Sequence, residues 1–325
     1  MVYYISAQPD DLFFKWQIEV QLFNFQKHKI PAENIHVLIA FNPQIGINPV
    51  FIALAREQSE KACFFFYEDN RKERNYISAL RPHVLKKHFA AYPSLTDEHI
   101  FYHDSDIIFR ELPDFERLCR RNVWSLSDTN NYISAKAIKK HGHVVFQEMC
   151  DLLDVSEALI EQNDDHAGGA QYLLSSVNYQ FWDKVEQDSE TLYTYLERNQ
   201  ERYIQAYREN NSAVPADYRG MQYWCADMWA LLWNALTMGY NVTVDKELDF
   251  CWPTDPIERW MHTKIFHNAG ITKAQSSQYF FKSAFDETPP YGLSFDHVLH
   301  DRCSIKYVDA IKEYEASIVS GAVSS

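Results

Sequence analysis

The segment IFYHDSDIIF, Ile100–Phe109, places a short polar stretch between two apolar runs that both predict buried β-strand. The polar side chains belong to His103, Asp104, Ser105 and Asp106. A buried carboxylate is unfavourable unless a counter-charge or hydrogen bonds compensate it. If the chain turns between the two strands, both aspartates can face one divalent cation, because Mg²⁺ and Mn²⁺ prefer carboxylate oxygens as ligands.

Upstream of this segment, strand-like and helix-like patterns alternate. Strands are predicted at 2–7, 34–41, 62–68 and 99–104, and helices at 11–30 after a cap at Asp10, at 47–61 and at 78–92. This alternation predicts an α/β fold with a mostly parallel sheet flanked by helices. Ligands bind at the carboxyl ends of such strands, so Ser6 and Gln8, near the end of the first strand, are candidate nucleotide contacts.

The remainder of the chain predicts a helical and loop-rich C-terminal part. Helices are expected at 134–154, 179–210, 222–240 and 306–317, and loops dominate from about Lys246. No GxGxxG follows the first strand and no GxxxxGK[ST] occurs, so neither a dinucleotide fingerprint nor a P-loop supports nucleotide binding. The DxD motif, Asp104-Ser105-Asp106, is therefore the main support for a nucleotide-binding site.

Composition limits the functional classes. The formal net charge of −14 disfavours binding to nucleic-acid backbones. We expect a soluble, cytoplasmic protein, because neither a signal peptide nor an apolar run long enough to span a membrane is visible. The six cysteines occur without a CxxC pair, which favours reduced core thiols over a zinc cluster or a catalytic cysteine.

The acidic pair has two interpretations. An arbitrary DxD is most often a turn in which one aspartate caps backbone amides, but its position after the fourth strand favours a metal site. His267 in KIFHNAG offers a third ligand, the alternative being a core histidine. With an ordinary histidine pKa near 6.5, metal-supported nucleotide binding is expected to weaken below about pH 6.

Four segments, IFYHDSDIIF, DDHAGGAQYLL, WCADMWALL and FHNAG, together resemble the GT-A fold nucleotide-sugar glycosyltransferases. Within them the chain is most similar to the group of hydroxyproline O-arabinosyltransferases and peptidyl-serine galactosyltransferases and its bacterial and phage relatives. The resemblance implies one domain over 1–325, with a nucleotide-sugar-binding half at 1–110 and an acceptor-binding half at 111–325. It also implies retention of anomeric configuration.

The resemblance implies roles for individual residues. Asp104, Asp106 and His267 would bind Mn²⁺ or Mg²⁺ on the diphosphate of a UDP-sugar, and Ser105 would approach the ribose. Gly168 and Gly169 would approach the donor sugar and the acceptor, and the flexibility of a glycine pair is compatible with close backbone approach to a ligand.

The acceptor hydroxyl needs orientation, and a base if one is used. Asp227 lies in an apolar, tryptophan-rich helix, so it is either a catalytic carboxylate or the N-cap of that helix. Gln171 is a further catalytic candidate beside the glycine pair, and Trp252 is a candidate for stacking on an acceptor sugar. Arg74, Arg81, Lys86 and Lys87 are either diphosphate contacts or a solvated helix face.

The leading hypothesis is therefore a metal-dependent transferase that moves a sugar from a UDP-sugar to a hydroxyl acceptor. Acceptors to consider are a glycan, a lipid, a protein or, for a viral chain, a modified DNA base. A nucleotidyltransferase acting on a sugar phosphate is one alternative, although the first strand lacks the glycine-rich and basic loop such enzymes use. A non-catalytic carbohydrate-binding protein is the other, and it would not need a DxD.

Overall fold

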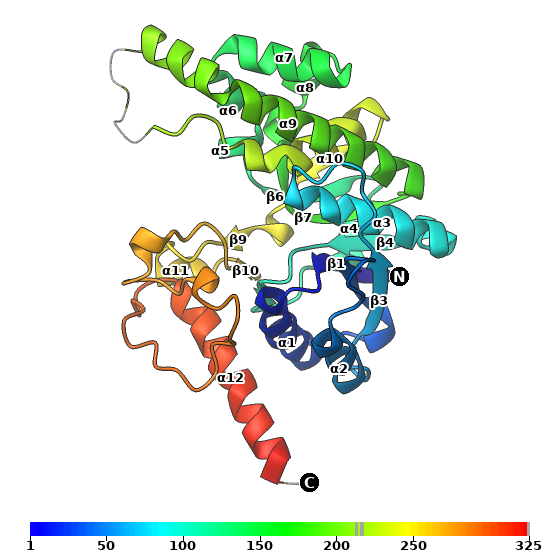
Figure 1. Ribbon diagram of the computed structural model, residues 1–325, viewed down its shortest axis with the longest axis vertical. Helices are drawn as coiled ribbons and strands as arrows, with labels where there is room; N and C mark the ends of the chain where they lie inside the picture. Colours follow the sequence, from blue (N-terminus) through cyan, green and yellow to red (C-terminus); the bar gives the residue numbers. More distant parts are fainter. Residues whose placement is uncertain (212–213, 215–217, 324–325) are drawn as a thin grey trace. The chain divides into compact units, whose positions relative to one another are not determined.

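The structure is a computed structural model that describes residues 1–211, 214 and 218–323. The chain divides into two compact units (Figure 1). The first contains Met1–Glu68, Ile100–Cys119 and Lys246–Ser325, and the second contains Asp69–His99 and Arg120–Asp245. The division into functional halves at residue 110 stays a prediction.

The first unit is built on four strands, three of them mostly buried and the fourth, at the edge of the sheet, only partly buried. Its strands follow the order β3-β2-β1-β4, with bounds Cys63–Glu68, Ile35–Phe41, Val2–Pro9 and His99–Tyr102. β1 pairs with β2 and β2 with β3, both in parallel. The crossovers contain α1 (Leu12–Lys27) and α2 (Pro49–Glu57). The predicted cap of α1 is wrong by one residue, since the side chain of Asp11, not Asp10, accepts the N–H of Phe13 at 2.9 Å.

A small second sheet lies within the same unit. β10 (Ile265–His267) pairs antiparallel with β5 (Ile107–Phe109) and parallel with β9 (Phe250–Cys251). The short helices α4 (Phe115–Cys119) and α11 (Ile257–Trp260) belong to this unit, and α12 (Ser304–Val323) ends it.

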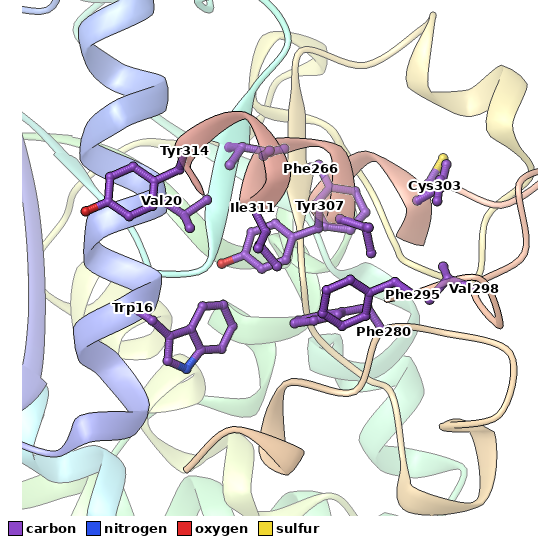
Figure 2. Packing of buried hydrophobic residues seen from close by; sticks show 14 of the residues in the cluster. Trp16, Val20, Phe266, Phe280, Phe295, Val298, Cys303, Tyr307, Ile311 and Tyr314 are labelled. Atoms are coloured by element: carbon purple, nitrogen blue, oxygen red, sulfur yellow. The ribbon is translucent and has the colours of Figure 1, made fainter. Parts of the chain in front are cut away.

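An apolar cluster fixes this sheet to α1 and α12 (Figure 2). α1 contributes Trp16 and Val20, and α12 contributes Tyr307 and Ile311. Phe266 of β10 is fully buried in the cluster, and its ring stacks on Tyr307 with centroids 5.8 Å apart. The strand that carries His267 is therefore held in place by packing with an N-terminal helix, α1, and a C-terminal helix, α12.

The second unit combines three strands with most of the helices. Its strands follow the order β7-β6-β8, with bounds Gly168–Ser175, Trp124–Asp128 and Val242–Val244, and β6 is antiparallel to β7. The long helix α9 (Tyr179–Asn210) packs against α3 (Leu80–Ala91) and α10 (Ala226–Thr237). The shorter helices are α5 (Asn130–Ile133), α6 (Ala135–Lys139), α7 (His143–Leu153) and α8 (Glu157–Gln162).

The helix predicted at 134–154 is wrong as a single element. It is divided into α6 and α7 because Gly142 has a φ of 129°, a backbone conformation that other residues rarely adopt and that is incompatible with a continuous helix. The helix predicted at 179–210 is confirmed at both ends, and Asn178 caps it by accepting the N–H of Phe181 at 3.0 Å.

The predicted fold class is confirmed: the chain is a mixed α/β protein with mostly parallel strands flanked by helices and with a helical, loop-rich C-terminal part. Among the described residues, no helix has both the length and the apolar character needed to cross a membrane.

Candidate functional site

The acidic turn lies where the chain passes from one sheet to the other. β4 ends at Tyr102 and belongs to the parallel sheet, whereas β5 begins at Ile107 and belongs to the small sheet. Antiparallel pairing of β5 with β10 places His267 opposite Ile107, and the N–H of Asn268 donates to the carbonyl oxygen of Asp106 at 3.0 Å. Backbone pairing thus brings a histidine 161 positions downstream of Asp106 to the acidic turn.

Asp104, Asp106 and His267 form a group that fits a metal ion. One ligand atom from each lies within 4.8 Å of the others. The Nε2 atom of His267 is 3.4 Å from Oδ2 of Asp104 and 3.3 Å from Oδ1 of Asp106. Ligands at right angles on a metal with bonds of about 2.1 Å lie about 3 Å apart, so the spacing and the chemistry of these side chains suit a divalent cation.

Burial and neighbouring charges shift the pKa values of Asp106 and His267 in opposite directions. Burial acts to raise the pKa of Asp106, but Lys282 and His267 outweigh it and hold this pKa below its ordinary value. Burial acts to lower the pKa of His267, but the Asp106 and Asp104 carboxylates outweigh it and raise this pKa to about 9. The expectation of an ordinary histidine pKa near 6.5 is therefore wrong for the metal-free protein, because two carboxylates stabilise the imidazolium.

Polar residues of α1 hold the acidic turn in place. The Nε2 atom of Gln21 donates to the carbonyl oxygen of Asp104 at 2.8 Å. Gln17, one helical turn earlier, accepts the hydroxyl of Ser105 at 3.4 Å. Both glutamines are buried. Neither residue is among the candidates chosen from the sequence, although polar residues at helical spacing, Gln17, Gln21 and Asn24, within a largely buried helix are a recognisable signal.

Two aromatic rings orient the imidazole of His267. Trp252 lies nearly parallel to it, with centroids 6.1 Å apart and planes at 21°, and Phe250 contacts it at 5.4 Å. These contacts give Trp252 a place beside the candidate metal ligand. Its predicted role in stacking on an acceptor sugar stays a prediction.

The sequence analysis also missed Lys282, whose Nζ atom forms an ion pair with Oδ2 of Asp106. This lysine comes from a short 3-10 helix, Lys282–Ala284, far downstream of the DxD. The only signal in the sequence is a single basic residue inside the aromatic run QYFFKSAF.

The predicted nucleotide contacts of the first unit are all buried. Ser6 lies within β1 and is 1% exposed. Gln8 donates through Nε2 to the carbonyl oxygen of Leu38 at 3.0 Å, which links β1 to β2. Ser105 is bonded to Gln17 as described above. Gln8 and Ser105 thus have partners within the protein, and the nucleotide-binding roles of all three side chains stay predictions.

Asp227 of the second unit belongs to a buried polar cluster. Its carboxylate accepts the hydroxyl of Tyr76 at 2.6 Å and lies 2.5 Å from a guanidinium nitrogen of Arg81. Asp227 is in the first turn of α10, and the N-cap position belongs to Cys225, so the N-cap interpretation is wrong. Burial, followed by the nearby Asp227 carboxylate, raises the pKa of Tyr76, which keeps this tyrosine neutral.

The glycine pair is explained by packing within the second unit. A Cβ atom on Gly168 would lie 2.5 Å from the carbonyl oxygen of Ser127 and 2.7 Å from Cβ of Leu126. On Gly169 it would lie 2.5 Å from Cε of Met228. Contacts within the protein are therefore enough to explain why glycine occupies both positions. The predicted approach of the glycine pair to the donor sugar and the acceptor stays a prediction.

The remaining candidates of this unit have partners in the same unit. Gln171 is fully buried and accepts the hydroxyl of Ser127 at 2.8 Å. Lys86 pairs with Asp183 at 3.0 Å and Glu186 at 2.6 Å. Lys87 donates to Asn70, and Arg74 donates to the carbonyl oxygen of Asp69. These basic side chains form ion pairs or hydrogen bonds within the unit, and a contact with the diphosphate stays a prediction.

Comparison with protein-family models and with curated protein sequences gives no match. Among solved structures, the chain is similar to the WbbM bifunctional glycosyltransferase, with 11% identity and a TM-score of 0.46, over 98% of this chain and 51% of WbbM. It therefore spans about half the length of that protein. It is similar to the galactosyltransferase LgtC over 96% of both chains, with 13% identity and a TM-score of 0.44.

A third similar structure is mouse xyloside xylosyltransferase 1, with 10% identity and a TM-score of 0.36, over 84% of this chain and all of that protein. All three are glycosyltransferases by description. Identities and scores at this level do not assign an activity to this chain.

Proposed function

We propose that this chain is a metal-dependent glycosyltransferase that transfers a sugar from a UDP-sugar to a hydroxyl acceptor. The observation that carries the proposal is the convergence of Asp104, Asp106 and His267 on one position at the end of a parallel strand. Sheets of this kind bind their ligands at the carboxyl ends of the strands.

Asp104 and Asp106 would supply two oxygens and His267 one nitrogen to the metal. The bound cation would neutralise the charge that develops on the departing nucleoside diphosphate. Because one ligand is an imidazole nitrogen, the set suits Mn²⁺ better than Mg²⁺, which prefers oxygen ligands and retains its water. Gln17 and Gln21 hold the turn, so the protein does not have to reorganise it on binding.

The roles of the other candidates belong to the same proposal. Ser6, Gln8 and Ser105 would contact the nucleotide, with Ser105 at the ribose. Gly168 and Gly169 would lie against the sugars. Asp227 and Gln171 would orient the acceptor hydroxyl.

Support for the role of Asp227 comes from its fixed carboxylate, which Tyr76 and Arg81 hold in one orientation. For the stereochemical course we propose retention, on the family resemblance alone. An NMR measurement of the anomeric proton of the first product formed tests this part separately.

Thermal stability tests the donor class. Ligands that bind the native state raise the melting temperature, so we compare UDP, GDP, ADP and their sugar conjugates, each with Mn²⁺, with Mg²⁺ or with EDTA. The expected result is stabilisation by UDP and UDP-sugars that requires Mn²⁺. Equal stabilisation in EDTA would contradict the metal role.

Product analysis separates the proposal from its alternatives. A glycosyltransferase releases UDP from a UDP-sugar, whereas a nucleotidyltransferase that builds a nucleotide sugar from a sugar phosphate releases pyrophosphate. A non-catalytic carbohydrate-binding protein releases neither. Slow Mn²⁺-dependent hydrolysis of a UDP-sugar to UDP, measured without any acceptor, is the expected outcome.

A further inference from the structure

Lys282 occupies part of the candidate metal site. The Nζ atom of Lys282 pairs with Oδ2 of Asp106, while the other oxygen of the same carboxylate faces His267 at 3.3 Å. The Asp106 side chain is only 3% exposed, whereas that of Lys282 is 29% exposed. A deeply buried carboxylate thus has an ammonium partner that can reach solvent.

The backbone around Lys282 is fixed, although its side chain is long and flexible. Phe280 and Phe285 stack with centroids 5.3 Å apart and planes at 8°. Trp16 donates through Nε1 to the carbonyl oxygen of Phe285 at 3.0 Å, and the N–H of Phe280 donates to the hydroxyl of Ser304 at 2.9 Å. Figure 2 shows Phe280 within the same cluster as Trp16 and Tyr307. The segment that carries Lys282 is therefore anchored on both sides, and the long lysine side chain can change partner without moving these anchors.

The charges of the site change when a divalent cation binds. Without it, the Lys282 side chain pairs with one oxygen of the buried Asp106 carboxylate while His267 faces the other, and a buried carboxylate left without such partners would be unfavourable. With two positive charges held between Asp104 and Asp106, the ammonium is no longer needed there and is repelled by the cation. A nucleoside diphosphate adds negative charge beside it, and an ammonium is a strong phosphate partner.

We propose that Lys282 is a positioning residue that exchanges partners: it pairs with Asp106 in the metal-free protein and with the donor diphosphate in the loaded protein. The inference rests on the proposed function. It predicts that metal and nucleotide bind cooperatively. The metal ion displaces Lys282 from Asp106, and the lysine ammonium then becomes available to pair with the diphosphate.

Removal of the ammonium should change the two binding steps in opposite directions. In Lys282→Met, Mn²⁺ alone should bind roughly 10-fold more tightly, because a competing positive charge is lost. UDP should bind roughly 10- to 100-fold more weakly at saturating Mn²⁺, as expected for loss of a charge-assisted hydrogen bond to phosphate. A purely structural lysine would not produce this reversal of sign.

The experiment titrates Mn²⁺ into nucleotide-free protein, with the electron paramagnetic resonance of free Mn²⁺ as readout, and then UDP into Mn²⁺-saturated protein by calorimetry. Lys282→Arg keeps the charge, so its Mn²⁺ affinity should stay within a few-fold of wild type. Lys306→Met is the matched control, because Lys306 belongs to the same unit, is also 29% exposed and pairs with Asp309. It should change neither titration.

Tighter Mn²⁺ binding with weaker UDP binding in Lys282→Met supports the exchange. Superimposable curves for that variant and wild type, or a parallel weakening of both steps, would overturn it. If Lys282→Met does not fold, Lys282→Gln replaces it with the same expected signs. If wild type binds neither Mn²⁺ nor UDP, the proposed function itself is rejected. This outcome differs from the one that rejects only the partner exchange of Lys282, in which wild type binds both ligands.

Discussion

The raised pKa of His267 predicts a measurable pH dependence of stability in the metal-free protein. Two carboxylates raise this pKa from 6.5 to about 9 in the folded chain. The folded state therefore binds the proton more tightly than the unfolded state does. The resulting stabilisation is fully present below about pH 6.5 and is lost as the pH rises through about 9.

The magnitude follows from the shift. Each pKa unit corresponds to about 1.4 kcal/mol, so a change from 6.5 to about 9 corresponds to about 3 kcal/mol of unfolding free energy. Replacement of His267 by glutamine removes the titrating group and keeps a polar side chain of similar reach. The free-energy difference between wild type and His267→Gln should therefore shrink by about 3 kcal/mol between about pH 6.5 and about pH 9.5.

Urea unfolding in EDTA at several pH values measures this difference directly. Subtraction of the variant removes the contributions of other groups that titrate in the same range. A difference that stays constant across the pH range would refute the reasoning, because it would show that His267 is not held as an imidazolium by Asp104 and Asp106.

Two further predictions concern the second unit. Gly168→Ala should cost about 1–3 kcal/mol of stability, because its Cβ meets a backbone oxygen and a Cβ atom. Gly169→Ala should cost less, because its Cβ meets only the far ends of the Met228 and Tyr172 side chains; equal losses in urea unfolding would contradict the packing explanation. Asp227→Asn should cost about 2 kcal/mol, because it removes the charge that binds Arg81 and Tyr76. The control Asp183→Asn affects a 42% exposed carboxylate and should cost less than about 1 kcal/mol, so a comparable loss in both variants would argue against a special role for the buried cluster.

The sequence predicts the local elements well, because their signals are local. The strands before the DxD and the helix Tyr179–Asn210 follow from apolar spacing and a capping residue, and the structure confirms them. The break between α6 and α7 escapes the same reasoning. The apolar spacing continues across Gly142, and only the backbone conformation of this residue ends the helical path.

The candidate site is predictable in part. The DxD and His267 can be chosen from their positions after strand-like runs, and the structure brings them within ligand distance. The ion pair of Lys282 with Asp106 and that of Arg81 with Asp227 join residues 176 and 146 positions apart. No periodicity in the sequence encodes these contacts, because they depend on how distant elements pack, and for the same reason the raised pKa of His267 cannot be anticipated from KIFHNAG.

The central claim is that Asp104, Asp106 and His267 hold a divalent cation that binds the diphosphate of a nucleotide sugar. Calorimetric titration of UDP into wild type and Asp106→Asn, each with Mn²⁺ and with EDTA, tests it most directly, because the amide keeps the shape of the carboxylate and removes its charge. We predict Mn²⁺-dependent UDP binding in wild type and its loss in the folded variant. Unchanged UDP affinity in Asp106→Asn, or equal affinity with Mn²⁺ and with EDTA in wild type, would contradict the claim.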